Sequence, residues 1–360
     1  QINNCGTRGR KDVTEKVSLN ARCSNLRWAF AGSTRSSLKK SLLVLFCLNL
    51  AFATACSATP TQEPAPESGT LWDKDSDLGI PVSAPLDGPE PGQTKQINMP
   101  NGRNFLLHVP EDYDADKRWP VVMVFHGWGE KPKTIEGYTE FNSAKAILVY
   151  PEGEDNAWTP APYAKTSEEE DLKFVADMVD SLRATYAVDD DRIFAAGLSN
   201  GGGFAAFLAC RMPETFRSIA TVSAAYYEGI HQGCSEAPVG RLDMHGTDDP
   251  VVEYYGGTRH ATKYDSVAEV MEQNRRRNEC TTQISTTQLV NNALQQTWIG
   301  CKAPLQHIRI GGGSHIWPGG LADDRAEVGK GFATDRVLDF FGIPGRPAGT
   351  IDPESGKKTK

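Results

Sequence analysis

The segment GLSNG, at positions 197–201, has the residue types of a turn that presents a nucleophile. It follows a predicted strand and precedes a predicted helix, and the small residues around Ser199 suit a tight strand-to-helix turn that leaves the serine hydroxyl exposed. A glycine-rich turn with a structural serine is the other interpretation of this segment. We predict that Ser199 is a nucleophile that forms a covalent intermediate.

A serine hydroxyl becomes reactive when a histidine takes its proton and a carboxylate orients that histidine. His315 lies in GGGSHIWP (311–318), a glycine-rich loop after a predicted strand, and is the predicted base. His245 is expected inside a strand, where a core role fits better. Asp248 and Asp249 follow that strand, and either carboxylate suits the orienting role. A helix cap or a salt bridge is the alternative for each aspartate.

Backbone N–H groups are also needed to stabilise the negative oxygen of a tetrahedral intermediate. The segment FHGWG (125–129) follows a predicted early strand, and its glycines allow the Trp128 N–H to turn inward. The Asn200 N–H, directly after Ser199, is the second predicted donor. His126 is expected to support this loop by hydrogen bonding rather than to act as a second base.

Short apolar runs alternate with amphipathic stretches from residue 99 onward. The run 120–125 is almost continuously apolar, as expected of a strand covered on both faces. This alternation predicts an α/β fold with a mostly parallel central sheet and helices on both faces. The predicted strands are 103–109, 120–125, 144–150 (which Pro151 should end), 192–196, 218–223, 241–245 and 307–310, and the predicted helices are 168–186, 202–211 and 335–341.

Four segments together resemble a known family. FHGWG, GLSNGGGF, HGTDDPVV and GGGSHIWPG are similar, in this order, to motifs of the secreted feruloyl esterases and related polyhydroxybutyrate-depolymerase-type esterases of the first carbohydrate esterase family. The resemblance spans residues 97–343 and implies an α/β-hydrolase fold. It also implies Ser199 as nucleophile, His315 as base and Asp249 as orienter, because Asp249 directly precedes the proline of the family motif. Ser314 departs from the family, in which a glycine commonly precedes the histidine.

The resemblance further implies an exported serine carboxylesterase that cleaves hydroxycinnamoyl (feruloyl) esters of plant cell-wall polysaccharide through an acyl-enzyme, with no metal or organic cofactor. Polyhydroxyalkanoate depolymerase or acetylxylan esterase activity with the same triad is the alternative, and a non-catalytic carbohydrate-binding surface protein is a remote one. Aromatic residues are candidates for a substrate pocket, with core packing as the alternative for each: Trp158, Tyr163, Tyr226, Tyr227 and Trp317.

Four cysteines lie in the predicted esterase domain: Cys210, Cys234, Cys280 and Cys301. An even number in an exported protein predicts two disulfides, and three connectivities are possible. We favour the sequential pairs, 210–234 and 280–301, which close loops of similar size. No C-x-x-C pair occurs, which argues against a zinc site.

A secretory signal peptide is predicted at residues 38–55. Lys39 and Lys40 precede the apolar run 41–53, which is shorter than the roughly 20 residues that a membrane-spanning helix needs, and small residues end the segment. Cys56 follows directly and is a lipidation candidate, with plain secretion as the alternative. The protein is therefore expected to be secreted or held at the cell surface, with membrane contact only through this anchor.

The remaining segments are expected to flank a single esterase domain at residues 99–345. Residues 1–37 are predicted to be an upstream or disordered extension, 56–98 a Pro/Ser-rich linker and 346–360 a disordered tail. The net charge of −8 disfavours nucleic acid as a partner, because that role needs clustered Lys and Arg. The expected partner is an ester substrate, linked to polysaccharide.

Overall fold

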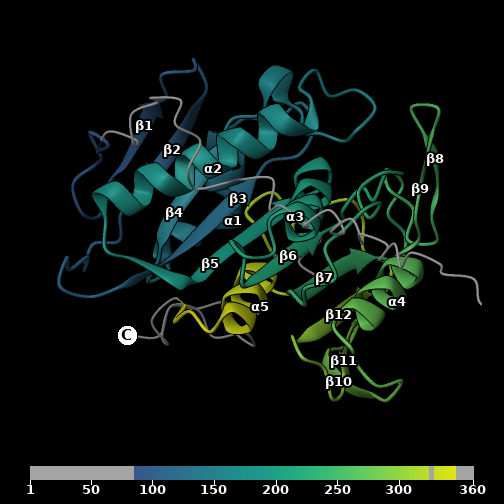
Figure 1. Cartoon of the computed structure of the whole chain (residues 1–360). Helices are drawn as coiled ribbons and strands as arrows, with labels where there is room; N and C mark the ends of the chain where they lie inside the picture. Colours follow the sequence, from purple (N-terminus) through teal and green to yellow (C-terminus); the bar gives the residue numbers. More distant parts are fainter. Residues whose placement is uncertain (1–84, 324–327, 346–360) are drawn as a thin grey trace, which may run out of the picture. The chain divides into compact units, whose positions relative to one another are not determined.

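The computed structural model describes residues 85–323 and 328–345 (Figure 1). The signal peptide, Cys56, the extension 1–37, most of the linker and the tail 346–360 fall outside these ranges. No helix in the described ranges is both long and apolar enough to cross a bilayer.

A ten-stranded sheet forms the centre of the fold, in the order β1-β2-β4-β3-β5-β6-β7-β12-β11-β10. The six strands from β4 to β12 in this order are parallel, and antiparallel strands flank them on both sides. The sheet strands are β1 Thr94–Asn98, β2 Asn104–His108, β3 Trp119–Phe125, β4 Ile147–Pro151, β5 Val188–Leu198, β6 Ser218–Val222, β7 Gly240–Gly246, β10 Ile284–Val290, β11 Ala293–Trp298 and β12 Leu305–Ile310. A separate hairpin joins β8 Gly257–Arg259 to β9 Thr262–Tyr264.

Helices cover both faces of this sheet, as the sequence predicts (Figure 1). Val121 and Met123 of β3 pack in one apolar core with α2 and α3, whereas Val122 and Val124 pack in a second core with α1 and α5. Alternate side chains of a strand point to opposite faces, so a continuously apolar strand serves both cores. The helices are α1 Pro132–Thr139, α2 Glu168–Thr185, α3 Asn200–Arg211, α4 Val267–Arg277 and α5 Phe332–Phe341.

Two helices begin where the local sequence satisfies their free N–H groups. Ser167 and Glu170 form a reciprocal capping box at the start of α2, and Ser266 and Glu269 form another at α4. Short 3-10 turns, Phe141–Ser143 and Glu154–Asn156, occur in the loops on either side of β4.

Several predicted boundaries differ from the structure; β5, for example, spans Val188–Leu198 rather than 192–196. Residues 94–98, assigned to the linker, form β1 and pair with β2 at the edge of the sheet. β4 ends at Pro151 as predicted, with the proline as its last residue rather than the first residue after it, and the missing N–H leaves the preceding ladder bonds intact. The helix after Ser199 begins at Asn200 rather than at Gly202.

Several elements had no strong pattern in the sequence. The short helix α1 contains a glycine and few apolar residues, and α4 is largely polar with only a narrow buried stripe. The strands β10 and β11 are mostly exposed or half-buried, so they lack the apolar runs of the central strands. All three regions depend on tertiary packing more than on local preference.

Two disulfides join the four cysteines in the sequential pairing, Cys210 to Cys234 and Cys280 to Cys301. The first ties the end of α3 to the loop before β7, and the second ties the end of α4 to the loop before β12. With sequence separations of 24 and 21, each contributes about 3 kcal/mol in the loop-entropy model.

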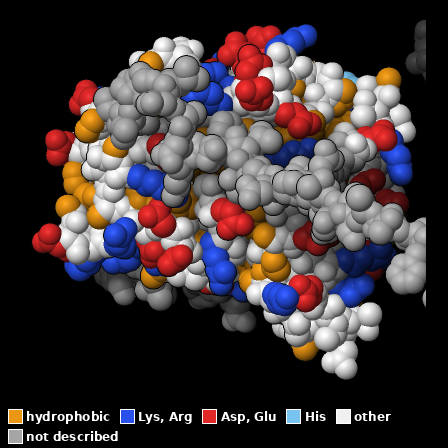
Figure 2. Space-filling view, viewed as in Figure 1, with side chains coloured by type: hydrophobic (Ala, Val, Ile, Leu, Met, Phe, Trp, Pro, Cys, Tyr) orange, Lys and Arg blue, Asp and Glu red, His pale blue; other side chains and the backbone are white. Residues whose placement is uncertain are grey.

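Acidic and basic side chains are interspersed on the face of the molecule in Figure 2, and hydrophobic side chains occur there in small groups. Among the large apolar side chains with substantial exposure, Trp128 and Tyr255 are aromatic. The position of Trp128 becomes important for the site described next.

Candidate active site

Ser199 occupies a strained turn between β5 and α3. Its backbone has φ 55° and ψ −117°, a conformation that a residue with a side chain adopts only at a cost, and such strain is common at functional sites. A Cβ on Gly197 would lie 2.4 Å from the Gly201 backbone, and one on Gly201 would lie 2.1 Å from the Phe125 carbonyl oxygen. The two glycines of the pentapeptide are therefore required by close backbone packing.

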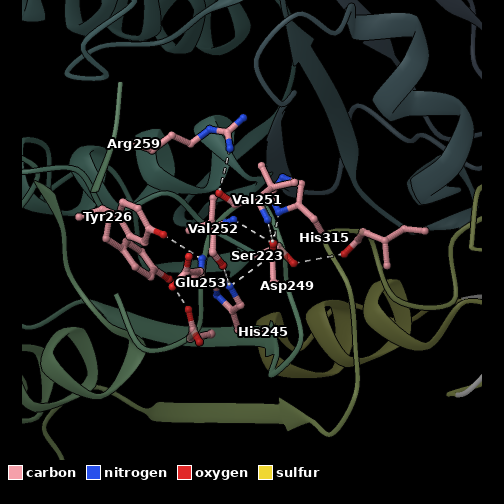
Figure 3. Close-up of polar contacts among 12 residues, drawn as sticks. Ser223, Tyr226, His245, Asp249, Val251, Val252, Glu253, Arg259 and His315 are labelled. Carbon is pink, nitrogen blue, oxygen red and sulfur yellow. Dashed lines mark hydrogen bonds and ion pairs between the residues drawn. The ribbon is translucent and has the colours of Figure 1, made fainter. Parts of the chain in front are cut away.

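Asp249 and His315 form a hydrogen-bonded pair (Figure 3). His315 Nδ1 donates to Asp249 Oδ2 at 2.8 Å, which leaves Nε2 of the same ring as a proton acceptor. Asp249 Oδ1 accepts the backbone N–H groups of Val251 and Val252 at 2.8 and 2.9 Å. In the part of the chain that the structure describes, no hydrogen bond involves His315 Nε2.

The surroundings of Asp249 keep it ionised. Burial alone would raise the pKa of this carboxyl, but hydrogen bonds from His245 and His315 outweigh burial and lower the pKa well below its usual range. Asp248, by contrast, is exposed and accepts a hydrogen bond from the neighbouring Thr247 hydroxyl. The structure therefore pairs His315 with Asp249 and not with Asp248, a choice that the residue types alone left open.

The loops that carry the aspartate and the histidine are fastened to each other. Asp248 N–H donates to the Gly313 carbonyl at 3.0 Å, and Gly312 N–H donates to the Thr247 hydroxyl at 2.9 Å. A Cβ on Gly246 would lie 2.2 Å from Gly313 O, so the two backbones touch where both residues are glycine.

The turn after β6 connects this pair to Ser199. Ser199 N–H donates to Val222 O at 2.9 Å, and the next residue, Ser223, donates its hydroxyl to Ile316 O at 3.4 Å. Ser199 and the His315 loop therefore bond to adjacent residues at the carboxyl end of β6. The structure brings the three predicted triad residues to one edge of the parallel strands.

The proposed oxyanion donors lie beside this serine. A Cβ on Gly127 would be 3.6 Å from the Ser199 Cβ, which places the loop before Trp128 against Ser199. No described residue accepts a hydrogen bond from the backbone N–H of Trp128 or Asn200. The Asn200 side chain instead holds the Trp158 backbone, accepting from its N–H at 2.8 Å and donating to its carbonyl at 2.9 Å.

His126 supports the loop 125–129 through hydrogen bonds. Its Nε2 accepts the Gly153 N–H at 3.0 Å, so its Nδ1 carries the hydrogen that is donated to Gly127 O at 2.8 Å. Burial lowers the pKa of His126 to about 4. The ring is therefore neutral at physiological pH and matches the structural role expected for it.

The aromatic candidates divide into core residues and one half-buried residue, Tyr163. Trp158, Tyr226 and Trp317 are at most 1% exposed, and Tyr227 is also buried. The structure corrects the substrate-binding assignment of Trp158, Tyr226 and Trp317, because the core encloses all three side chains. Trp158 stacks on Phe204, the Trp317 Nε1–H donates to the Thr334 hydroxyl, and the Tyr226 hydroxyl donates to Asp243.

Tyr163 belongs instead to an exposed aromatic cluster that we call the Trp128 cluster: Trp128, Tyr163 and His260. The rings of Trp128 and Tyr163 stack with centroids 4.5 Å apart, and the His260 ring meets both edge-on. Trp128 is 49% exposed. His260 was not predicted; it stands at the tip of the β8–β9 hairpin with φ 52°, and only tertiary structure carries it to Trp128.

No set of three or more His, Cys, Asp or Glu side chains in the described ranges could hold a metal ion. The site that the structure describes consists of side chains and backbone groups suited to acyl transfer.

Comparison with known proteins identifies the family. A family model described as a putative esterase matches residues 97–297, and the chain belongs to this esterase family. The parallel sheet, the strained serine turn after β5 and the chain order of serine, aspartate and histidine define the α/β-hydrolase fold. The protein is a serine carboxylic-ester hydrolase.

Individual relatives have low sequence identity to this chain. A probable feruloyl esterase C from Aspergillus niger is 26% identical over 274 residues, covering 72% of this chain and 91% of that protein. Feruloyl esterase C from Emericella nidulans is 27% identical over 272 residues, again covering 72% and 91%. Among solved structures, an acetyl xylan esterase from Aspergillus awamori has a TM-score of 0.47 at 16% identity, covering 69% of this chain and 99% of that one.

Proposed function

We propose that the protein is an exported esterase that releases hydroxycinnamic acids from plant cell-wall polysaccharide, with Ser199, His315 and Asp249 as its triad. The observation that carries this proposal is the Asp249–His315 hydrogen bond on a loop attached, through the β6 turn, to the strained Ser199. That arrangement supplies a nucleophile, a base with a free Nε2 and an ionised orienter.

In the proposed reaction, Ser199 Oγ attacks the ester carbonyl carbon while His315 Nε2 takes the hydroxyl proton. The carbonyl oxygen becomes negative and is stabilised by the N–H groups of Trp128 and Asn200. The C–O bond to the alcohol then breaks, and His315 returns the proton to the leaving oxygen. A water molecule, deprotonated by the same histidine, hydrolyses the acyl-enzyme and regenerates Ser199.

The Trp128 cluster supports a planar aromatic acyl group. Trp128 directly follows the loop that faces Ser199, and its ring is half exposed with a second ring stacked on its other side. A hydroxycinnamoyl ring gains stacking energy from such a surface, whereas an acetyl group has no ring to stack. Two relatives named feruloyl esterase C agree with this substrate class.

Export is proposed from the predicted signal peptide together with the two disulfides, which persist in oxidising compartments. N-terminal sequencing of the released protein should begin after Ala55. A blocked, lipid-modified Cys56 would identify the anchored form.

The substrate proposal is tested on the full chain with methyl ferulate, p-nitrophenyl acetate and p-nitrophenyl butyrate, comparing wild type with Ser199→Ala. Ser181→Ala is the matched control, because Ser181 is a buried serine in α2 whose hydroxyl donates to the Asp177 carbonyl. Loss of all activity in Ser199→Ala alone supports the nucleophile. Activity on the small esters without ferulate release would overturn the aromatic preference and favour acetyl or hydroxyalkanoate esters.

A further inference from the structure

A second imidazole contacts the carboxylate of the proposed triad. His245, near the end of β7, lies on the opposite side of Asp249 from His315 (Figure 3). Its Nε2 is 2.9 Å from Val252 O and 3.3 Å from Asp249 Oδ2. Asp249 Oδ2 is the same oxygen that accepts from His315 Nδ1.

The hydrogen on His245 can be placed from these partners. Both atoms facing Nε2, a carbonyl oxygen and a carboxylate oxygen, are acceptors, so Nε2 carries an N–H shared between them. His245 Nδ1 is buried and has no hydrogen-bond partner among the described residues. Burying a polar atom in this way costs free energy that an apolar side chain of similar size would avoid. The hydrogen bonds of Nε2, and not those of Nδ1, therefore explain why a histidine occupies this position.

The Asp249 carboxylate has its acceptor positions filled. Backbone N–H groups of Val251 and Val252 bond to Oδ1, and two imidazoles share Oδ2. The backbone bonds hold one oxygen in place, and the His245 N–H holds the other. A rotation of this carboxylate about its Cβ–Cγ bond would break all of these contacts together.

We propose that His245 is a positioning residue that fixes Asp249 Oδ2 toward His315 and, by donating to that same oxygen, limits how strongly the carboxylate retains the proton on His315. This role rests on the proposed triad. Removing the His245 N–H leaves Oδ2 more basic, so protonated His315 becomes more stable and the base form is lost at a higher pH.

Other charged and titratable groups surround His245. Burial disfavours its protonation, but Asp249 and Asp243 outweigh burial and raise the pKa of His245. The groups facing it are Asp243 on β7, Asp249 and Tyr254 in the following loop, and His307 and Arg309 on β12, of which Arg309 is its register partner.

The test compares His245→Gln with His245→Asn in the full chain. Both side chains are polar amides that differ by one methylene, and only glutamine can place an N–H where Nε2 stands. With p-nitrophenyl acetate, we expect His245→Asn to lower kcat about tenfold with little change in KM, and to move the acid limb of kcat/KM upward by about half a pH unit or more. His245→Gln should restore most of kcat.

His108→Gln is the control for general effects of replacing a buried strand histidine, because His108 on β2 bonds to Thr94 far from the site. Asp249→Asn provides the second control. In that background, His245→Asn should add no further loss, because its effect acts through the carboxylate.

Three results would overturn the positioning role: equal kcat for His245→Gln and His245→Asn, an unmoved acid limb, or an undiminished His245→Asn effect in the Asp249→Asn background. If Asp249→Asn itself retains full activity, the triad assignment fails, which is a separate outcome. Thermal unfolding of each variant distinguishes loss of fold from loss of positioning.

Discussion

Two Asp–His pairs join β7 to β12 or to the loops that follow them, and the hydrogen bonds within the pairs have the same length. Asp243 and His307 are register partners inside the strands, with Nδ1 2.8 Å from Oδ2. Asp249 and His315 lie in the following loops with the same atoms 2.8 Å apart. Both carboxylates are completely buried.

The pairs differ at the far side of the imidazole. His307 Nε2 is bonded to the Tyr254 hydroxyl at 2.7 Å, and its side chain is 2% exposed. His315 has no described partner at Nε2 and is 17% exposed. Of these two pairs, only Asp249–His315 therefore has the unbonded second nitrogen that the proposed triad needs.

The largest effect on turnover should come from removing the imidazole of the Asp249–His315 pair. His315→Gln should lower turnover of p-nitrophenyl acetate by about 10⁴-fold, because glutamine cannot accept the serine proton. His307→Gln should lower the melting temperature but retain turnover in the folded fraction. Comparable turnover losses in both folded variants would remove the distinction between the pairs.

The next largest effect on kcat should come from Asp249, the proposed orienter, whereas its exposed neighbour Asp248 should have almost none. Asp249→Asn should reduce kcat by about 10³–10⁴-fold, since an amide favours the wrong orientation or tautomer of His315. Asp248→Asn, one residue earlier and exposed, should stay within about twofold of wild type. Steady-state kinetics of the two variants measures the contrast, and a larger loss for Asp248→Asn would contradict the assignment.

Asp243→Asn should lower the free energy of unfolding rather than the turnover rate of the folded enzyme. Asp243→Asn leaves His307 and Tyr226 without a buried charge partner and should cost about 3 kcal/mol of unfolding free energy near neutral pH. The folded-state pKa of Asp243 is depressed: burial opposes the shift, and His307 outweighs burial. Its stabilisation is therefore present above the unfolded pKa of about 4 and is lost as pH falls below it. Urea unfolding at several pH values should show the gap between wild type and variant narrowing in acid.

The smallest expected effect concerns the exposed ring of Trp128. Trp128→Ala keeps the backbone N–H but removes the stacking ring, so KM for methyl ferulate should rise about fivefold while p-nitrophenyl acetate hydrolysis changes less than about twofold. Tyr255→Ala is the matched control, because Tyr255 is an exposed aromatic that contacts Tyr254 and not Trp128. Equal losses on both esters would argue against an acyl-ring surface.

The central strands and the location of the candidate triad could be predicted because their signals are local. The continuous apolar run of β3 indicates burial on both faces, and the glycines around Ser199 reflect a turn that close backbone packing requires. The edge elements β10 and β11 lack such runs, since they are covered little.

The roles of individual polar and aromatic side chains could not be predicted in the same way. Nothing in the type or spacing of Asp243 and His307 shows that they meet, because they are 64 residues apart and join only through strand register. Likewise, Trp158 and Tyr163 are both aromatic, yet Trp158 is fully buried in the core whereas Tyr163 is half-buried and stacks on the exposed Trp128.

The contact between Gly246 and Gly313 has a consequence for protein engineering. Because the aspartate and histidine loops touch through backbone atoms and exchange hydrogen bonds, neither can change length or conformation alone. A loop graft from a related esterase should therefore transplant both segments together.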